Sequence, residues 1–323
     1  MYYCFVKEDL EIMEEKDPLM IQAAYAKALG KFLCLEIEHS CVTDQHGNEQ
    51  SINGQTVFLR TTCWNLDEAN KILVKLGANL IETNADVKRI ENWTSLELTK
   101  RKIFSVRYKD ILEHSFSEEV KVYLTQIPRV FMKSKSKGYC VKIPSHRLIN
   151  PDEEVMSFFE NFKNDNHEEL LMTEELQMKS DSLGNKESRH VVLNGRIINS
   201  SRALHSLKHA VPKTLLLKAE EIVSQIAKIE SFPQNYILDI GMFEKDGDIF
   251  ADIVEMNPLA VSLCYVNNSV FEEDILEIKT LKKKWNMGAE YCFDMLTHPD
   301  NYVETRRFGE NYSYLNEGHY ELR

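Results

Sequence analysis

The stretch that most constrains this chain is residues 236–258, which read YILDIGMFEKDGDIFADIVEMNP. Two apolar runs, 236–243 and 249–256, flank the tripeptide Lys245-Asp246-Gly247. An Asp-Gly pair between such runs is a strong hairpin signal, because the turn requires positive φ angles that Gly adopts without a steric penalty. The sequence therefore predicts a β-hairpin here.

Three polar residues interrupt the apolar pattern of this hairpin: Asp239, Glu255 and Asn257. Residues two apart in a strand share a face, so Glu255 and Asn257 can point the same way, and the hairpin can bring Asp239 alongside them. Mg²⁺ prefers oxygen ligands of this kind, together with phosphates. The alternative is an acidic sheet edge that binds no ligand.

Composition excludes several classes of protein. A chain of 323 residues is long enough for two or more compact units. Its net charge of −12 argues against a nucleic-acid binder, which needs a basic surface. The seven cysteines are scattered and include no CxxC pair, which indicates a reducing compartment. Because the sequence has neither a membrane-length apolar run nor a signal-peptide layout at its start, we expect a cytoplasmic protein without a membrane partner.

The first part of the chain alternates strands with helices. We expect strands at 2–7, 32–38, 56–63 and 79–82 and helices at 18–29 and 65–78, with Asn65 as the N-cap of the second helix. This alternation is typical of parallel βαβ units. Residues 1–93 are therefore predicted to form a small α/β domain.

The middle of the chain is basic. Residues 95–147 hold 12 Lys and Arg against 5 Asp and Glu, which suggests that they face either the acidic hairpin or a polyphosphate. Within them, RVFMKSKSKGYCVKI predicts a strand that ends near Lys133, a loop at Ser134–Gly138 and a second strand. Such a loop can cover phosphates with its backbone N–H groups, although most loops of this composition are solvated turns.

A second hairpin precedes the first along the chain. Residues 187–193 and 196–201 flank Asn194-Gly195, a dipeptide that fits a type I′ turn. Arg189 shares a strand face with Val191 and Leu193. An Arg on such a face usually has an anionic partner, because an unpaired charge there is costly; the alternative is a solvated Arg189.

Taken together and in order, these motifs resemble the ATP-grasp superfamily. The resemblance rests on Lys133 before a Gly-containing loop, the acidic stretch Glu174-Glu175-Leu176, ESRHVVLNGRI followed by Arg202, and DIG followed by VEMNP. It covers residues 95–260 and is most similar to the divergent ligase-type members marked by one arginine and two lysines. It implies an α+β fold in which two α+β subdomains clamp ATP, preceded by the small α/β domain. The implied domains are 1–93 (N-terminal), 94–178 (ATP-grasp lid and central subdomain) and 179–323 (C-terminal subdomain with the magnesium and phosphate site).

The resemblance also implies roles for individual residues. Lys133 would contact the α-phosphate and adenine, and the loop with Ser134, Lys137 and Gly138 would cover the β- and γ-phosphates. The backbone of Glu174–Leu176 would bind adenine, with Glu174 or Glu175 near the ribose. Arg189 and Arg202 would neutralise the transferred phosphoryl group or the substrate carboxylate, Asp239, Glu255 and Asn257 would hold Mg²⁺, and a further lysine is matched by Lys100 or Lys102. The loop here has one Gly where many family members have several, which puts its contacts in doubt.

The implied activity is ATP- and Mg²⁺-dependent ligation of a carboxylate to an amine through an acyl phosphate. Positioning and charge neutralisation by Lys, Arg and Mg²⁺ are what phosphoryl transfer requires of a protein. The alternatives are a kinase or other phosphotransferase, and a catalytically silent nucleotide-binding scaffold. A polynucleotide ligase is excluded, because those enzymes have one residue between the nucleophilic Lys and Asp-Gly. The sequence does not name the carboxylate or the amine.

Overall fold

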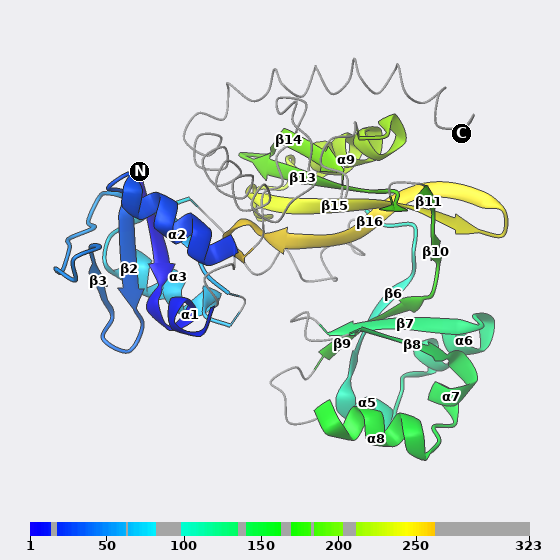
Figure 1. Ribbon diagram of the computed structural model, residues 1–323. Helices are drawn as coiled ribbons and strands as arrows, with labels where there is room; N and C mark the ends of the chain where they lie inside the picture. Colours follow the sequence, from blue (N-terminus) through cyan, green and yellow to red (C-terminus); the bar gives the residue numbers. More distant parts are fainter. Residues whose placement is uncertain are drawn as a thin grey trace. The chain divides into compact units, whose positions relative to one another are not determined.

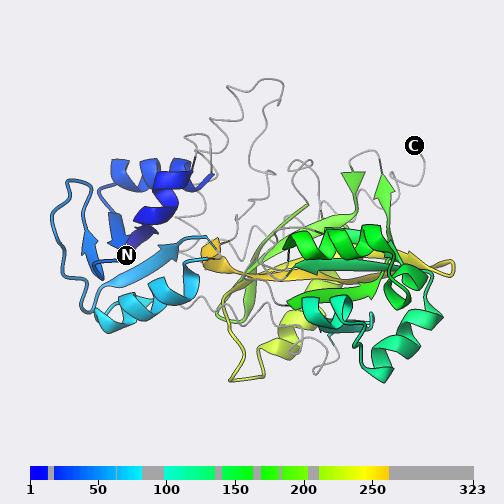
Figure 2. The same cartoon turned by 90° about the horizontal axis from the view of Figure 1, so that it is seen from below.

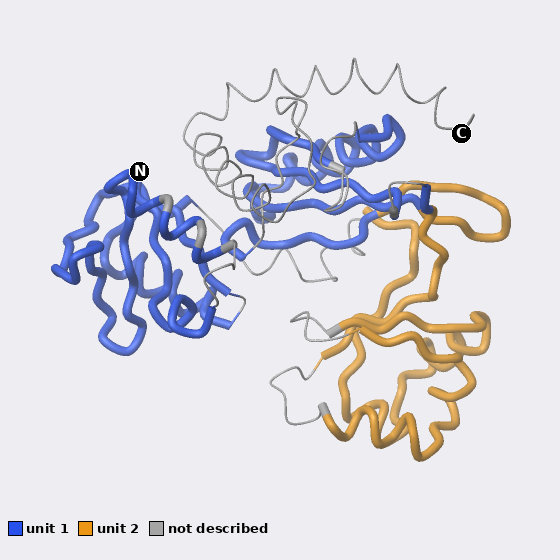
Figure 3. Tube along the Cα trace, viewed as in Figure 1, with its two compact units in different colours: residues 1–87, 180–242, 253–323 blue, residues 88–179, 243–252 orange. Residues whose placement is uncertain are grey.

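The computed structural model describes residues 1–13, 18–62, 64–81, 98–134, 140–162, 169–181, 184–202 and 211–261. Its contacts divide the chain into two compact units. Unit 1 comprises residues 1–87, 180–242 and 253–323, and unit 2 comprises residues 88–179 and 243–252 (Figure 3). Residues 243–252 are the outer part of the hairpin predicted at 236–258, so each unit holds part of that hairpin. The three-domain division with boundaries after residues 93 and 178 stays a prediction.

Unit 1 begins with a five-stranded sheet in the order β3-β2-β1-β4-β5 (Figure 1). Its strands are β1 (Tyr2–Val6), β2 (Phe32–Glu36), β3 (Cys41–Thr43), β4 (Thr56–Arg60) and β5 (Asn79–Leu80). The pairs β1–β2, β1–β4 and β4–β5 are parallel, and only β3 is antiparallel to its neighbour. The predicted parallel sheet is confirmed.

Helices cover both faces of this sheet (Figure 2). On one face, α2 (Pro18–Ala28) packs on Tyr3, Phe5 and Phe58; on the other, α3 (Leu66–Lys75) packs on side chains such as Leu59. Alternate residues of a strand point to opposite faces, which is why neighbours in β1 and β4 belong to different apolar clusters. A third helix, α1 (Lys7–Ile12), follows β1 directly and was not predicted.

Asn65 is the N-cap residue of α3, as predicted, but its side chain does not cap the helix. Asn65 makes no side-chain cap hydrogen bond; its Nδ2 instead donates to Oδ1 of Asp9 at 2.8 Å. Asp9 is 1% exposed and also accepts hydrogen bonds from Thr61 and Thr62. Because this buried carboxylate binds the residues after Arg60, β4 ends there, and the strand predicted to reach residue 63 is shorter.

Two hairpins build the second sheet, as predicted: β13 (Glu187–Leu193) pairs with β14 (Arg196–Arg202), and β15 (Tyr236–Lys245) pairs with β16 (Asp248–Pro258). The two hairpins are joined by the pairing of β13 with β15, which was not predicted. Both turns have positive φ angles: 50° and 68° at Asn194-Gly195, and 52° and 87° at Asp246-Gly247. These values fit type I′ turns. That turn type was predicted for Asn194-Gly195, and a hairpin turn with positive φ was predicted for Asp246-Gly247. A register shift lies between Val191 and Val192, both of which are fully buried.

The helix α9 (Lys213–Ile226) contributes six buried residues to the unit. Val191, Leu193 and Ile237 of the second sheet also join the apolar cluster that holds α2 and the first sheet. The two sheets of unit 1 therefore share a core.

Unit 2 is built on an antiparallel sheet in the order β6-β9-β7-β8. These strands are β6 (Ile103–Arg107), β7 (Arg129–Ser134), β8 (Cys140–Pro144) and β9 (Glu169–Glu174). The helices are α5 (Tyr108–Leu112), α6 (Glu118–Gln126), α7 (Ser145–Ile149) and α8 (Glu153–Phe162). Short strands follow: β10 (Gln177–Met178), which pairs with β15, and, in unit 1, β11 (Ser180–Asp181) with β12 (Gly184–Asn185). No helix among the described residues is both long enough and apolar enough to cross a membrane.

Candidate functional site

Asp239 and Glu255 converge on one guanidinium group. Arg189 and Asp239 are direct partners in the register of β13 and β15. The Nε and Nη2 atoms of Arg189 donate to Oδ1 and Oδ2 of Asp239 at 2.7 and 2.6 Å, which is a bidentate pair. Nη2 also lies 3.7 Å from Oε1 of Glu255 on β16. The expectation that Arg189 has an anionic partner is confirmed.

This cluster is sheltered from water. The side chain of Arg189 is 14% exposed, that of Asp239 is 2% exposed and that of Glu255 is 17% exposed. Charges that are removed from water in this way interact strongly, and losing one partner leaves the other buried without compensation. The hairpin of β15 and β16 therefore places two carboxylates at one guanidinium group, that of Arg189 on β13.

Asn257 completes the predicted magnesium set on the same strand. It is 1% exposed, and its Nδ2 atom has no hydrogen-bond partner within the described residues. The Nδ2 atom is a hydrogen-bond donor and cannot bind a metal, but it can donate to an oxygen of a ligand, since buried polar groups are normally paired. The atom of this amide that would bind a metal is Oδ1. Two carboxylates and one amide supply the oxygen donors that Mg²⁺ prefers, with phosphates and water completing its shell.

The described residues hold no cluster of three or more His, Cys, Asp or Glu side chains that could bind a metal on its own. An acid pair that shares a metal with phosphate oxygens needs no third carboxylate. The residues present therefore fit Mg²⁺, and the metal site stays a prediction.

Part of the predicted site lies outside the described residues. This holds for Lys137 and Gly138 of the loop and for the side chains of Ser134 and Arg202. The backbone of Ser134 ends β7, and that of Arg202 ends β14 opposite Ser188. Lys133 lies on β7 opposite Cys140 and Leu171, so it is placed on a central strand of the antiparallel sheet.

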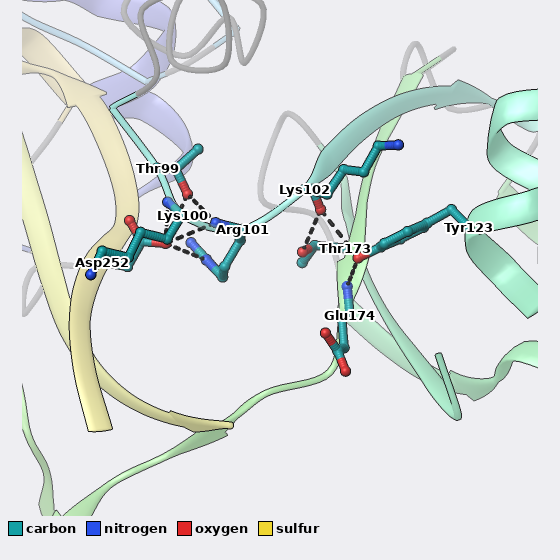
Figure 4. A network of polar contacts seen from close by, with 8 residues as sticks. All are labelled: Thr99, Lys100, Arg101, Lys102, Tyr123, Thr173, Glu174 and Asp252. Atoms are coloured by element: carbon teal, nitrogen blue, oxygen red, sulfur yellow. Dashed lines mark hydrogen bonds and ion pairs between the residues drawn. The ribbon is translucent and has the colours of Figure 1, made fainter. Parts of the chain in front are cut away.

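The predicted adenine linker, Glu174–Leu176, begins at the last residue of β9 and is held by hydrogen bonds (Figure 4). The hydroxyl of Tyr123 accepts from the backbone N–H of Glu174 at 2.9 Å and donates to the carbonyl of Lys102 at 3.3 Å. Thr173 Oγ1 donates to the same carbonyl at 3.0 Å. The next N–H, of Glu175, donates to the carbonyl of Arg129 at 3.0 Å. Leu176 lies in no strand and, among the described residues, makes no hydrogen bond.

The two acidic side chains of the linker have different partners. Glu175 binds Arg129 at 2.7 Å and Lys142 at 2.8 Å, and hydrogen bonds from Lys142 and then Arg129 lower the pKa of its carboxyl group. Glu174 binds Lys245 of the hairpin at 2.6 Å, and this bond raises the pKa of the Lys245 ammonium group. Among the residues that the structure describes, Glu174 thus has one cationic partner and Glu175 has two, which makes Glu174 the freer of the two carboxylates.

The residues before β6 are anchored by Asp252, which sequence reasoning missed. This carboxylate is fully buried and accepts hydrogen bonds from Thr99 Oγ1 at 2.8 Å and from the backbone N–H of Lys100 at 3.1 Å (Figure 4). The Nε atom of Arg101 lies 3.3 Å from it, and burial is the main cause of a lowered Arg101 pKa. Asp252 interrupts an apolar strand as Asp239 does, and that interruption was an available signal. Part of the basic segment 95–147 therefore faces the acidic hairpin. This was one of the two alternatives expected for the segment, the other being a polyphosphate.

The two candidate lysines have different surroundings. The ammonium group of Lys102 lies 2.9 Å from Glu119 of α6, and that of Lys100 lies 5.8 Å from the centre of the Phe250 ring. Neither arrangement decides between them, and both remain candidates.

No protein-family model matches the chain, and no curated protein matches it. Solved structures do match the chain, with probability 1.00 for each of the three that follow. D-cycloserine synthetase DcsG has a TM-score of 0.51 and 11% identity, with 90% of this chain and 99% of that chain covered. The D-alanine-D-alanine ligase from Coxiella burnetii has a TM-score of 0.51 and 11% identity, with 97% and 100% covered. VanG D-Ala:D-Ser ligase from Enterococcus faecalis has a TM-score of 0.52 and 12% identity, with 89% and 99% covered.

Identities this low establish the fold alone. The chain has the ATP-grasp fold, a mixed α+β architecture, as predicted from the order of its motifs.

Proposed function

We propose that this protein is an ATP- and Mg²⁺-dependent ligase that joins a carboxylate to an amine through an acyl phosphate. The observation that carries the proposal is the convergence of Asp239 and Glu255, with the buried side chain of Asn257 two residues beyond Glu255 on the same strand. On an ATP-grasp fold this set suits a magnesium-bound triphosphate. Two of the similar structures are named as ligases that join D-amino acids, which supports ligation.

In the proposed reaction an oxygen of the substrate carboxylate bonds to the γ-phosphorus of ATP, and ADP leaves. An amine then attacks the acyl carbon, and phosphate leaves with the electron pair of the broken C–O bond while the amine loses a proton. Mg²⁺ would neutralise charge on the phosphates. Asp239, Glu255 and Asn257 would hold it, and Arg189 and Arg202 would balance the charge of the transferred group.

The residues of unit 2 would bind the nucleotide. The N–H groups of Glu174 and Glu175 are already donated within the protein, so Leu176 offers the remaining linker N–H to an adenine acceptor. Glu174 would be the carboxylate near the ribose, because it has a single cationic partner. Lys133, the loop with Ser134, Lys137 and Gly138, and Lys100 or Lys102 would meet the phosphates. Membership of the subgroup marked by one arginine and two lysines belongs to this proposal.

One observation favours the silent scaffold instead. Both oxygens of Asp239 accept hydrogen bonds from Arg189, so a protein cation already stands where a metal is expected. A carboxylate has further lone pairs, and sharing Asp239 between Arg189 and Mg²⁺ remains chemically reasonable. The two proposals differ in whether ATP is consumed.

The deciding experiment is incubation with ATP, Mg²⁺ and a panel of amino acids, followed by mass spectrometry. ADP with an amide product supports the ligase, ADP with a phosphorylated product indicates a kinase, and AMP contradicts the acyl-phosphate route. Binding of ATP without turnover indicates the scaffold.

Glu255→Gln should abolish the Mg²⁺-dependent turnover while changing the melting temperature little, since the variant keeps the shape of the side chain. The matched control is Glu244→Gln on the same hairpin. The carboxylate of Glu244 binds Lys179, so this substitution should not affect turnover. Turnover retained in Glu255→Gln would remove Glu255 from the metal site.

A further inference from the structure

The segment that follows the predicted magnesium ligands is fastened to the first sheet of unit 1. Leu259–Val261 form a short 3-10 helix, η2, directly after Asn257 and Pro258. Arg60, the last residue of β4, donates from Nη1 to the carbonyl of Leu259 at 2.8 Å. The next residue, Thr61, donates its backbone N–H to the carbonyl of Ala260 at 3.2 Å. Two successive carbonyls after β16 thus accept hydrogen bonds from the last residue of β4 and from the residue that follows it.

Arg60 is itself held in place. It is 3% exposed, its Nε donates to Oε1 of Gln22 on α2 at 2.7 Å, and its guanidinium lies 5.8 Å from the centre of the Phe58 ring. The guanidinium is planar and presents donors in fixed directions, so bonding to Gln22 through Nε fixes where Nη1 points. The side chain therefore connects α2, β4 and η2.

Packing strengthens this connection. Leu259 is fully buried in the apolar cluster with Phe58, while Ala260 is fully buried in the cluster on the opposite face of the sheet. Because Pro258 fixes its own φ angle, little freedom remains between Asn257 and the held carbonyl of Leu259. The backbone that follows Asn257 is thus held by contacts that begin in the first sheet.

We propose that Arg60 is a positioning residue for the magnesium–nucleotide site: through the carbonyl of Leu259 it fixes the backbone that carries Glu255 and Asn257. This inference rests on the proposed function. Groups that orient metal ligands from one step away typically alter metal affinity by about 10- to 100-fold when they are removed.

The test is a titration of each variant with Mn²⁺ in the presence of AMPPNP, a non-hydrolysable analogue of ATP. Electron paramagnetic resonance measures the bound Mn²⁺, at a temperature below the unfolding temperature of each variant. Arg60→Met should weaken Mn²⁺ binding by about 10-fold or more, because it removes the hydrogen bonds to Gln22 and to the carbonyl of Leu259. Arg60→Lys keeps a cationic donor and should recover part of the loss. Arg60→Gln replaces Arg60→Met should the latter not fold.

The matched control is Thr62→Val, which removes a hydrogen bond to Asp9 at the same edge of the sheet without touching η2. It should lower the melting temperature and leave Mn²⁺ affinity unchanged. Two results would overturn the role of Arg60 without touching the proposed function. One is wild-type Mn²⁺ affinity in Arg60→Met, and the other is an equal loss of Mn²⁺ affinity in Arg60→Met and Thr62→Val. No Mn²⁺ binding by the wild-type protein would overturn the proposed function and this inference with it.

Discussion

Asp239 is a carboxylate in a place where water cannot stabilise its charge, and Arg189 supplies the compensation. The bidentate geometry, at 2.7 and 2.6 Å, satisfies both oxygens of the carboxylate. A pair like this contributes modest net stability, because desolvation of both groups offsets most of the attraction. Removing one member of the pair is strongly destabilising, since the other member is left charged and buried.

Arg189→Met should lower the free energy of unfolding by about 3–5 kcal/mol, because Asp239 loses its buried partner. The double variant Arg189→Met with Asp239→Asn should lose less than the single variant, since no unpaired charge remains. Urea denaturation of both proteins measures the difference. Equal losses would show that the cost comes from packing of the Arg189 side chain and not from an uncompensated charge.

The partner of Arg189 could be predicted in part from the sequence. An Arg on a strand with Val191 and Leu193 requires an anion, and this requirement is local. That the anion is Asp239 follows from strand register, which the sequence does not state. Asn65 shows the opposite case: its cap role was predicted from neighbouring residues, and the buried carboxylate of Asp9, 56 positions away, takes its side chain instead.

At the scale of elements, the tight turns were the most predictable features. Asn194-Gly195 and Asp246-Gly247 specify positive φ angles by their own chemistry, so both hairpins could be placed before any contact was known. Short elements such as α1 carry too few residues for a periodic pattern. Contacts between distant elements were also missed, including those that hold the linker after β9.

Tyr123→Phe tests that linker. The variant removes the hydroxyl that joins α6 to the carbonyl of Lys102 and the N–H of Glu174, 51 positions away. Leaving the Glu174 N–H without its partner should cost about 1–3 kcal/mol in unfolding free energy. Amide hydrogen exchange should accelerate at the end of β9, and unchanged exchange there would contradict a positioning role for the hydroxyl.

Tyr123→Phe should also change how the free energy of unfolding depends on pH in alkaline solution. Burial is the main cause of a Tyr123 pKa raised above its ordinary value of 10.0, so the folded protein keeps a proton that the unfolded chain releases. The stability associated with this group is present in full below pH 10 and declines as pH rises. The gap in unfolding free energy between wild type and Tyr123→Phe should therefore narrow above pH 10. A gap that widens would show that the phenol is not the group responsible.

At the scale of the whole molecule, the proposed function divides its parts between two units. Glu255 and Asn257 belong to unit 1, whereas Lys133 and the linker belong to unit 2. The fold could be predicted from the order of these parts along the chain, because each strand and turn carries its own local signal. That Glu255, Asn257, Lys133 and the linker bind one nucleotide depends on contacts between distant parts of the chain, which the sequence does not state. It stays a prediction.

A single ligand that touches both units must stabilise both. At about 100 times its Kd, a nucleotide adds about 2.7 kcal/mol to the stability of whatever it binds. Hydrogen exchange with and without Mg²⁺ and AMPPNP should therefore slow together in β7 of unit 2 and in residues 253–258 of β16, which belong to unit 1. Glu255→Gln and Lys133→Ala should each reduce the protection in both strands, since each weakens the same complex. Protection confined to one unit would mean that the nucleotide binds there alone, and that the carboxylates of the hairpin and the lysine of β7 serve separate purposes.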